Sequence, residues 1–487
     1  MQKFFGREQE LEILKKISQS KRPEFIALYG RRRVGKTYLI RQAFNQKNAI
    51  FFNVTGTQGG ARKEQIAHFI EKLGEVFYNG IPVSAPVNWS EAFKILTKAI
   101  ESQPKNKKII LFFDELPWMA TKKARLLETL EYYWNQYWSN DARIKLIVCG
   151  SSASWIIQKV INNKGGLHNR ITQKMPLDPF TLNETKQYLE GQGVKLKNQQ
   201  ILLLYMVTGG VPYYLSHIKK GLSAIQIIED LAFTKTGVLL EEFNNLFASL
   251  FEHSEEYIKI IRAVASARYG ISQSELLTIL GPSAMGSVGL KRLNELEETG
   301  FIMSFMPYQH KRQGIYYRLI DEYSLFYLKW IEPIKTRIQR KDLDRNNWTV
   351  MQNNPAWNSW LGLAFESVCY KHISTIKKAL RIVPGALADS WRYVPRKGEV
   401  ERGAQIDLLF DRPDDAITLC EIKFSEEPFI LTKEYVEVLK RKIEVFKNRT
   451  RTKKQLFLAM ITSGGLKNNF YADELISGVV NLNDFFH

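Results

Sequence analysis

Short apolar runs alternate with longer amphipathic stretches over the first third of the chain. Between the runs, apolar residues recur at helical spacing over residues 62–79 and 89–103. The runs themselves are typical of buried strands in a parallel sheet and cover residues 25–29, 49–54, 109–113 and 145–150. This alternation of strands and helices predicts an α/β fold built on a parallel sheet.

The pattern changes twice in the rest of the chain. Residues 181–250 carry leucine-rich helical turns with few strand signals. From residue 257, three short helical stretches precede two strand-like runs, a pattern typical of the winged form of the helix-turn-helix. We therefore expect an α/β core (1–180), a helical lid (181–250), a winged-helix domain (251–325), a connector (326–355) and a C-terminal α/β domain (356–487).

Composition narrows the class of partner. The 69 Lys and Arg residues outnumber the 50 Asp and Glu residues, which gives a net charge of +19. This balance favours a polyanionic partner, most often DNA or another nucleic acid, over a merely soluble basic surface. Three well-separated cysteines are expected as reduced core residues of a cytoplasmic protein. We expect no membrane partner, because no apolar run reaches the length of a membrane span and no signal peptide is evident.

A glycine-rich loop follows the first apolar run. Residues 30–37 match the pattern G-x-x-x-x-G-K-[ST], and a helical stretch follows. In that context backbone N–H groups and a helix N-terminus cradle phosphates, whereas a chance match in a basic loop lacks the flanking strand and helix. Lys36 is expected to reach the β- and γ-phosphates of ATP, and the Thr37 hydroxyl to bind Mg²⁺. The predicted nucleotide-binding residues are Gly30, Arg31, Arg32, Arg33, Val34, Gly35, Lys36, Thr37 and Tyr38.

Polar residues at the ends of later strands supply candidates for hydrolysis. The third run ends in Asp114 and Glu115, at the edge where open α/β sheets bind ligands. Asp114 is expected to hold the water shell of Mg²⁺ and Glu115 to polarise the attacking water; a plain acidic turn is the alternative. Ser151, after the fourth run, is placed to contact the γ-phosphate or the water. Arg170 is a candidate to stabilise the transferring phosphoryl group, in its own subunit or in a neighbouring subunit of a homo-oligomer.

These motifs together resemble the AAA+ ATPases, and more closely the archaeal-type ATPase family that is grouped with the STAND signalling ATPases and related to origin-recognition proteins. The resemblance implies that Ser151 takes a sensor position and that Pro212 sits near the adenine. The lid lacks an arginine where many AAA+ proteins carry a second sensor. The residues that carry the resemblance are 5–8, 29–37, 113–115, 149–152 and 209–213.

Two acids and a lysine mark a hairpin in the C-terminal domain. We assume a register in which Asp407 pairs with Leu419 across the turn. Because side chains alternate, Asp407 and Glu421 then share a face as diagonal neighbours, roughly 7–8 Å apart at Cα. Two carboxylates so placed can clamp one Mg²⁺ or Mn²⁺ ion, with Lys423 orienting the water or stabilising developing charge.

This constellation resembles the PD-(D/E)xK nuclease family, with Glu366 on an upstream helix and a basic helix at residues 434–451. The resemblance implies metal-dependent DNA cleavage by Glu366, Asp407, Glu421 and Lys423. The first hypothesis is therefore an enzyme in which ATP binding and hydrolysis govern a DNA-directed nuclease, as in defence or mobile-element maintenance. The alternative is a nucleotide-switched DNA- or protein-binding regulator with an inactive nuclease-like domain. Within the winged helix, Lys311 and Arg312 of the wing are better DNA-binding candidates than Lys291 and Arg292, because the third helix also carries three glutamates; a winged helix used for protein packing is the alternative.

Overall fold

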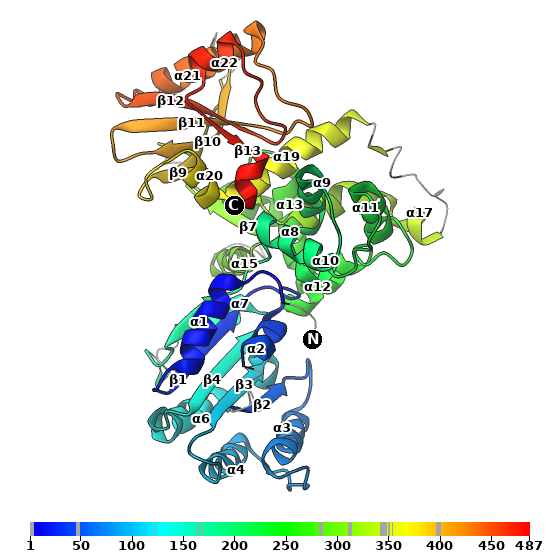
Figure 1. The fold of residues 1–487 in the computed structure, drawn as a ribbon, viewed down its shortest axis with the longest axis vertical. Coiled ribbons are helices and arrows are strands. Elements are labelled where there is room, and N and C mark those ends of the chain that lie inside the picture. The colour runs from blue at the N-terminus through cyan, green and yellow to red at the C-terminus, as the bar shows by residue number, and fades with distance from the viewer. Residues whose placement is uncertain are drawn as a thin grey trace. The chain divides into compact units, whose positions relative to one another are not determined.

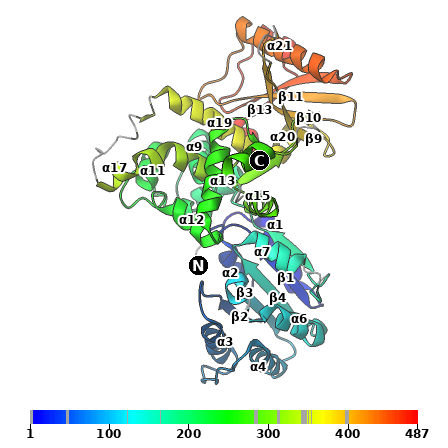
Figure 2. The same cartoon turned by 180° about the vertical axis from the view of Figure 1, so that it is seen from behind.

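The chain forms two compact units in the computed structural model (Figures 1 and 2). The first unit comprises Met1–Pro179 and Leu250–Glu252, and the second comprises Phe180–Ser249 and His253–His487. None of the helices in the described part of the chain is long and apolar enough to cross a membrane. The structure describes residues 4–44, 49–121, 123–162, 165–167, 169–281, 286–309, 314–340, 348, 351–352, 354–395 and 401–487.

A sheet of parallel strands forms the centre of the first unit (Figure 1). Its spatial order is β2-β3-β4-β1-β5, and every neighbouring pair is parallel. The strands are β1 (Glu24–Tyr29), β2 (Ala49–Thr55), β3 (Lys108–Asp114), β4 (Ile144–Gly150) and β5 (Gln173–Pro176). The parallel sheet and its four predicted strands are confirmed, and β5 is an additional short strand beside β1. Because all five strands are parallel, their carboxyl ends share one edge, which collects the residues that follow each strand.

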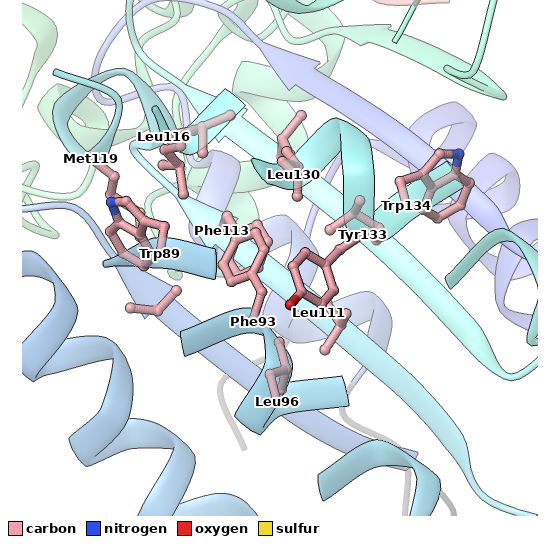
Figure 3. Packing of buried hydrophobic residues seen from close by; sticks show 14 of the residues in the cluster. Trp89, Phe93, Leu96, Leu111, Phe113, Leu116, Met119, Leu130, Tyr133 and Trp134 are labelled. Atoms are coloured by element: carbon pink, nitrogen blue, oxygen red, sulfur yellow. The ribbon is translucent and has the colours of Figure 1, made fainter. Parts of the chain in front are cut away.

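Helices cover both faces of this sheet. Along β1, Phe25 and Ala27 belong to one apolar cluster while Ile26 and Leu28 belong to the other, which is why the strand reads as a continuous apolar run. In the larger cluster, Phe93 stacks on Phe113 with ring centroids 5.9 Å apart (Figure 3). The helices are α1 (Glu8–Gln19), α2 (Lys36–Phe44), α3 (Arg62–Phe77), α4 (Trp89–Glu101), α5 (Leu116–Met119), α6 (Leu126–Gln136) and α7 (Ala153–Ile156), with short helices η1 (Trp138–Asn140) and η2 (Ile157–Ile161).

The second unit begins with helices, as the sequence predicts. Helix α9 (Asn198–Thr208) is buried on nearly every side. It packs against α8 (Leu182–Gly191), α11 (Ala224–Ala232), α16 (Glu322–Phe326), α19 (Pro355–Lys371) and the short helix η6 (Leu482–Phe486). His372 ties the start of α8 to α19, because its Nε2 accepts the backbone N–H of Leu182 at 3.3 Å and its Nδ1 lies 2.8 Å from the carbonyl oxygen of Val368. The helices are α8 (Leu182–Gly191), α9 (Asn198–Thr208), α10 (Pro212–Leu215), α11 (Ala224–Ala232), α12 (Glu242–Leu250), α16 (Glu322–Phe326), η4 (Tyr327–Ile331), η5 (Glu332–Ile334), α17 (Lys335–Arg340) and α19 (Pro355–Lys371).

Three helices and a small antiparallel sheet lie between these segments in the sequence. The three predicted helices and both predicted strands are present, and a two-residue strand adds a third member in the order β6-β8-β7. The assignment as a winged helix stays a prediction, and Lys311 and Arg312 at the proposed wing tip lie outside the described residues. The elements are α13 (Ser254–Ser266), β6 (Ile271–Ser272), α14 (Gln273–Leu280), α15 (Ser287–Glu298), β7 (Ile302–Phe305) and β8 (Tyr316–Leu319).

A second five-stranded sheet, ordered β13-β12-β11-β10-β9, ends the chain. Strands β9, β10 and β11 pair in antiparallel fashion, whereas β11, β12 and β13 pair in parallel. The predicted hairpin is confirmed as β10 and β11. The elements are α20 (Ile373–Ala379), β9 (Leu387–Tyr393), β10 (Ala404–Asp411), β11 (Ala416–Lys423), α21 (Lys433–Thr450), β12 (Gln455–Thr462), α22 (Phe470–Leu475), β13 (Gly478–Asn481) and η6 (Leu482–Phe486).

Candidate nucleotide site and C-terminal carboxylate cluster

The glycine-rich loop of residues 30–37 joins the carboxyl end of β1 to the start of α2. Gly30 has a φ of +152°, and a Cβ there would lie 2.2 Å from the carbonyl oxygen of Leu177. Gly35 has a φ of +90°, but nothing lies within 4 Å of a Cβ built on it. The first glycine is therefore required by both space and conformation, and the second by conformation alone.

Lys36 lies inside this loop and is almost fully buried. Its Nζ donates to the carbonyl oxygens of Gly30 at 2.8 Å and Arg31 at 2.9 Å. The ammonium group therefore stands at the N-terminus of α2, where the first backbone N–H groups of the helix also favour an anion. The loop thus combines the cation and the donors that a polyphosphate requires, and phosphate binding by Lys36 stays a prediction.

The two predicted magnesium ligands are brought together at the edge of the sheet. The Thr37 hydroxyl, in the first turn of α2, donates to Oδ2 of Asp114 at 2.6 Å. Asp114 ends β3 and is 4% exposed. Mg²⁺ prefers oxygen ligands and keeps several waters, so one hydroxyl and one carboxylate beside a phosphate site form a suitable donor set. The residues present therefore fit the ion that the sequence predicts.

Glu115 and Ser151, predicted from different motifs, contact each other directly. Oε2 of Glu115 accepts the backbone N–H of Ser151 at 2.9 Å and its hydroxyl at 2.9 Å. Glu115 itself has a φ of +50°, the left-handed conformation, which is uncommon outside glycine. Strained conformations of this kind persist where the surrounding structure enforces them and cluster at functional sites. The carboxylate is thus fixed in one position at the adjacent ends of β3 and β4.

The three arginines of the loop differ in their surroundings. Arg31 is buried, with 3% of its surface exposed. The guanidinium of Arg32 lies 5.9 Å from the ring centre of Trp118, within the range of a cation–π contact. Arg33 has a φ of +74°, so the loop departs from ordinary strand or helix geometry at this point too. Their predicted contacts with nucleotide stay predictions.

Sequence reasoning gave no role to Arg7 beyond its place in the family motif. The residue is 4% exposed, and its guanidinium donates to the carbonyl oxygens of Val34 at 3.2 Å and Asp178 at 2.5 Å. It therefore braces the phosphate loop against the segment that follows β5. Beside the loop, the ring of Phe4 stacks on that of Tyr38 with centroids 5.6 Å apart. The glycine–arginine pair ahead of the first helix was the signal in the sequence.

Arg170 and Pro212 were also predicted as site residues. Arg170 lies in an exposed turn ahead of β5, and within the described ranges no hydrogen bond or ion pair joins its side chain to the phosphate loop. Pro212 begins α10 in the second unit, so its place near the adenine stays a prediction. The three cysteines are unpaired and buried, as expected.

The assumed register of the C-terminal hairpin is wrong by two residues. Leu419 pairs with Leu409 and not with Asp407. The pairing extends further into the turn than assumed, because the N–H of Arg412 donates to the carbonyl oxygen of Ala416 at 2.9 Å. This leaves a three-residue loop that ends in Asp415 at a φ of +59°, a common hairpin connection.

A shift of two residues keeps the predicted face but changes the geometry between the acids. Continuing the observed register places Asp407 directly opposite Glu421 and not diagonal to it. Such neighbours have Cβ atoms about 4.5–5.5 Å apart. The backbone N–H of Ile422 also donates to Oδ2 of Asp407 at 3.2 Å. The two acids therefore lie closer together than the assumed register implied.

Glu421 is held by three side chains. Lys442 Nζ lies 2.9 and 2.7 Å from its two carboxylate oxygens, Lys423 Nζ lies 3.0 Å from Oε1, and the Tyr435 hydroxyl donates to Oε1 at 2.7 Å. Burial alone would raise the pKa of Glu421, but the two lysines and the tyrosine outweigh it and hold the pKa below its ordinary value. Glu421 is therefore ionised, and the two lysine ammonium groups compensate its negative charge. Lys442 was not among the predicted site residues.

The other two acids of the cluster are pushed in the opposite direction. Burial, reinforced by the charge of Glu421, raises the pKa of Asp407 to about 6. Burial, reinforced by the charge of Asp407, raises the pKa of Glu366 to about 8, against the partial opposition of Arg268 and Arg318. The cluster therefore resists carrying three negative charges at once.

A second metal ion does not fit this cluster as it stands. Among the described residues, no group of three or more His, Cys, Asp or Glu side chains is arranged to hold a metal ion. One of the two predicted ligands, Glu421, already has two ammonium groups within 3.0 Å. The predicted site of Asp407 and Glu421 thus has the chemistry of a carboxylate–lysine cluster and not that of a formed metal centre.

The parallel sheet, the phosphate-loop geometry and the acidic strand end together define the first unit as an ATPase-type α/β domain. Residues 4–218 match a family described as an ATPase domain predominantly from Archaea. The match extends beyond the first unit into the helices that begin the second.

Comparisons over longer stretches give relatives of low identity. An uncharacterized protein of Methanocaldococcus jannaschii, MJECL04, is 25% identical over 428 residues, which cover 87% of this chain and 88% of the relative. A Walker-type ATPase of Pyrococcus abyssi is similar over 67% of this chain and 96% of its own, with 19% identity and a TM-score of 0.47. The ORC2 protein of Aeropyrum pernix, in ADPNP–ADP complexes, is similar over 69% of this chain and 94% of its own, with 15% identity and a TM-score of 0.45.

Proposed function

We propose that the protein binds and hydrolyses ATP, and that its nucleotide state governs an action on DNA. The observation that carries the first part is the cluster in which Glu115 is fixed by Ser151 beside the Thr37–Asp114 pair. Lys36 binds the β- and γ-phosphates, and Thr37 with Asp114 holds Mg²⁺. The ion supplies positive charge to the phosphate oxygens. Glu115 accepts a proton from the attacking water, since its carboxylate is already oriented by two hydrogen bonds.

ATP hydrolysis by the full-length chain tests this assignment. Glu115→Gln keeps the size of the side chain but removes the base, so ATP binding is retained and turnover falls by about 10²–10⁴-fold. Lys36→Ala removes ATP binding altogether. Glu71→Gln on the exposed face of α3 is the matched control and keeps wild-type turnover. Wild-type turnover in Glu115→Gln would refute the assignment of the base.

DNA is the proposed partner because of the charge distribution. The net charge is +19, and residues 433–454 contain nine Lys and Arg residues against three Glu. Part of this positive charge is already used within the domain, because Lys442, Arg449 and Lys454 bridge carboxylates. A gel shift of duplex DNA by the full chain at two salt concentrations tests the proposal. An absence of binding at low salt would instead favour a nucleotide-switched regulator of another protein.

Cleavage of that DNA is the second candidate function, and the carboxylate cluster favours it. Asp407, Glu421 and Glu366 gather acidic groups next to Lys423, and two of the acids have strongly raised pKa values. Acidic side chains that serve only in ion pairs are not usually placed next to one another, whereas functional sites commonly contain neighbouring acids with shifted pKa values. The proposal assigns no role to a second metal ion, because the described arrangement of Asp407, Glu421 and Glu366 does not form a metal site.

Plasmid cleavage by the full chain, with ATP and Mg²⁺ or Mn²⁺ added singly and together, separates the two functions. Asp407→Ala is expected to fold, bind DNA and hydrolyse ATP, yet to cut nothing. Asp473→Ala, an exposed acid on α22, is the control and cuts as wild type does. If wild type and Asp407→Ala are equally inactive in every condition, the C-terminal domain is a binding module. Homo-oligomerisation through the ATPase unit, with Arg170 acting on a neighbouring subunit, belongs to the same proposal.

A further inference from the structure

A cavity of about 390 Å³ lies inside the second unit and was not foreseen from the sequence. Its walls come from the end of α13 and the small sheet on one side, and from α19, β9 and β10 on the other. The walls are joined directly, because the N–H of Tyr308 donates to the carbonyl oxygen of Ser390 at 2.9 Å. A guanidinium nitrogen of Arg318 also donates to the Ser390 hydroxyl at 2.8 Å. The cavity is therefore built by packed elements distant in the sequence.

Arg318 is fixed in the wall of the cavity. Its guanidinium lies 3.7 Å from the ring centre of Phe305 and 4.0 Å from that of Tyr370, so the cation is held between two aromatic faces. Its buried Nε has no hydrogen-bond partner in the described part of the chain. A buried guanidinium donor without a partner costs free energy, and an anionic or carbonyl oxygen in the cavity would supply the acceptor.

Two further arginines stand at the mouth of the cavity. Arg392 and Arg268 are exposed, and their guanidinium groups lie 4.2 and 5.4 Å from the ring centre of Tyr269. Two cations gathered around one aromatic ring repel each other, and the approach of a phosphate offsets that repulsion. The ring and the guanidinium planes also offer faces on which a nucleic-acid base can stack.

The floor of the cavity is formed by acidic side chains. Asp407 and Glu366 line it, and Gln405 donates to Oδ1 of Asp407 at 3.1 Å. Carboxyl oxygens, whether the group is ionised or protonated, accept hydrogen bonds from the exocyclic amino groups of bases. A nucleotide is therefore matched in one orientation, with its phosphate at the arginines of the mouth and its base edge toward the acids.

We propose that this cavity binds one unpaired nucleotide of a single DNA strand. The volume lies within the range of sites that enclose small ligands, and a base that is still paired cannot enter because its partner strand would need the same space. The inference rests on the proposed action on DNA and deepens it, since it names single-stranded DNA as the form that reaches Asp407. Binding at this cavity requires neither cleavage nor ATP hydrolysis.

Arg392→Gln in the full chain tests the proposal. The probe is a fluorescent single-stranded oligonucleotide about ten nucleotides long, within the site sizes usual for such binding. Loss of one phosphate contact raises the Kd about tenfold and lowers the slope of log Kd against log salt by about one. Arg337→Gln on the exposed face of α17 makes the same change in charge and leaves Kd within twofold. Affinity for a duplex of the same length changes equally little in both variants.

The outcomes separate this inference from the proposed function. If single-strand binding weakens in Arg392→Gln but plasmid cleavage is absent in wild type, the cavity is upheld and the nuclease proposal fails. If cleavage occurs and the two variants bind single strands equally well, the cavity proposal fails while the nuclease proposal stands. A free deoxynucleoside monophosphate, added at the same concentration as the oligonucleotide, should not displace it. Displacement would show that the cavity binds a small nucleotide and would refute a DNA strand as its ligand. Unchanged thermal melting of Arg392→Gln confirms that the fold is intact.

Discussion

Replacing Gly30 with alanine gives the sharpest test of the phosphate-loop geometry. The added Cβ would lie 2.2 Å from the carbonyl oxygen of Leu177. That oxygen cannot retreat easily, because the N–H of Leu177 donates to the carbonyl oxygen of Tyr29 at 2.7 Å and Pro176 pairs with Tyr29 in the sheet. Either the loop or the end of β5 must therefore move by at least 0.8 Å to restore a 3.0 Å separation.

The cost has two parts that a second variant can separate. A non-glycine residue at positive φ costs about 1–3 kcal/mol, and forcing an extra carbon into a packed site costs about another 1–3 kcal/mol. Gly59 has a φ of +72° and nothing within 4 Å of a built Cβ, so Gly59→Ala carries only the first part. The difference between the two variants therefore isolates the packing contribution of the loop.

Thermal melting of the first unit within the full chain measures that difference. A packing cost of about 1–3 kcal/mol lowers the melting temperature of Gly30→Ala by about 5 °C relative to Gly59→Ala for a unit of this size. Binding of a fluorescent ATP analogue should be lost in Gly30→Ala and kept in Gly59→Ala, since only the first change displaces the carbonyl oxygen that holds Lys36. Equal melting temperatures together with equal ATP binding would refute the reasoning.

Two contacts described above and the net charge of the chain each lead to a further prediction. Ser151→Ala removes one of the two hydrogen bonds to the Glu115 carboxylate, worth about 1.5 kcal/mol, so kcat for ATP should fall about tenfold while the Kd for ATP stays unchanged; an unchanged kcat contradicts the positioning role. Burial lowers the pKa of His372 to about 4, so its neutral form stabilises the second unit above pH 6.5 and that stability is lost as the pH falls toward 4. The loss reaches about 3 kcal/mol and should shrink in His372→Gln, as urea unfolding at pH 7.5 and pH 4.5 would show. DNA affinity should fall steeply with salt, and a flat dependence would exclude phosphate contacts as its source.

The sequence predicted the geometry around the glycine-rich loop well because its signals are local, and nucleotide binding there stays a prediction. The need for glycine at position 30 depends only on the backbone around that residue. The acids Asp114 and Glu115 follow an apolar strand, and a parallel sheet is enough to place the end of that strand at the same edge as Lys36. The contact between Glu115 and Ser151 was not predictable in the same way. It depends on β3 and β4 being neighbours, which is a property of strand order and not of either motif.

The C-terminal hairpin was predicted only in part from local sequence patterns. The alternation of side chains correctly placed Asp407 and Glu421 on one face, and a register shift of two residues preserves that face. The turn length was not predictable, because Asp415 adopts a left-handed conformation that shortens the loop to three residues. Lys442 comes from a helix 21 residues beyond Glu421, so its neutralising role appears only once α21 is packed on the sheet. The cavity between distant segments was invisible for the same reason.

The burial of α9 has a consequence for where the chain can be truncated. Its cover comes partly from α19 and η6, which belong to the last third of the chain. A protein shortened before residue 355 would keep the whole family match but lose the packing of the Tyr205 ring against the His372 ring, whose centroids lie 5.7 Å apart, together with the cover that α19 and η6 give to α9. Such a fragment is expected to aggregate even though its nucleotide loop is intact. Limited proteolysis should therefore release fragments that end near residue 179, and not the family-matched segment that ends at residue 218.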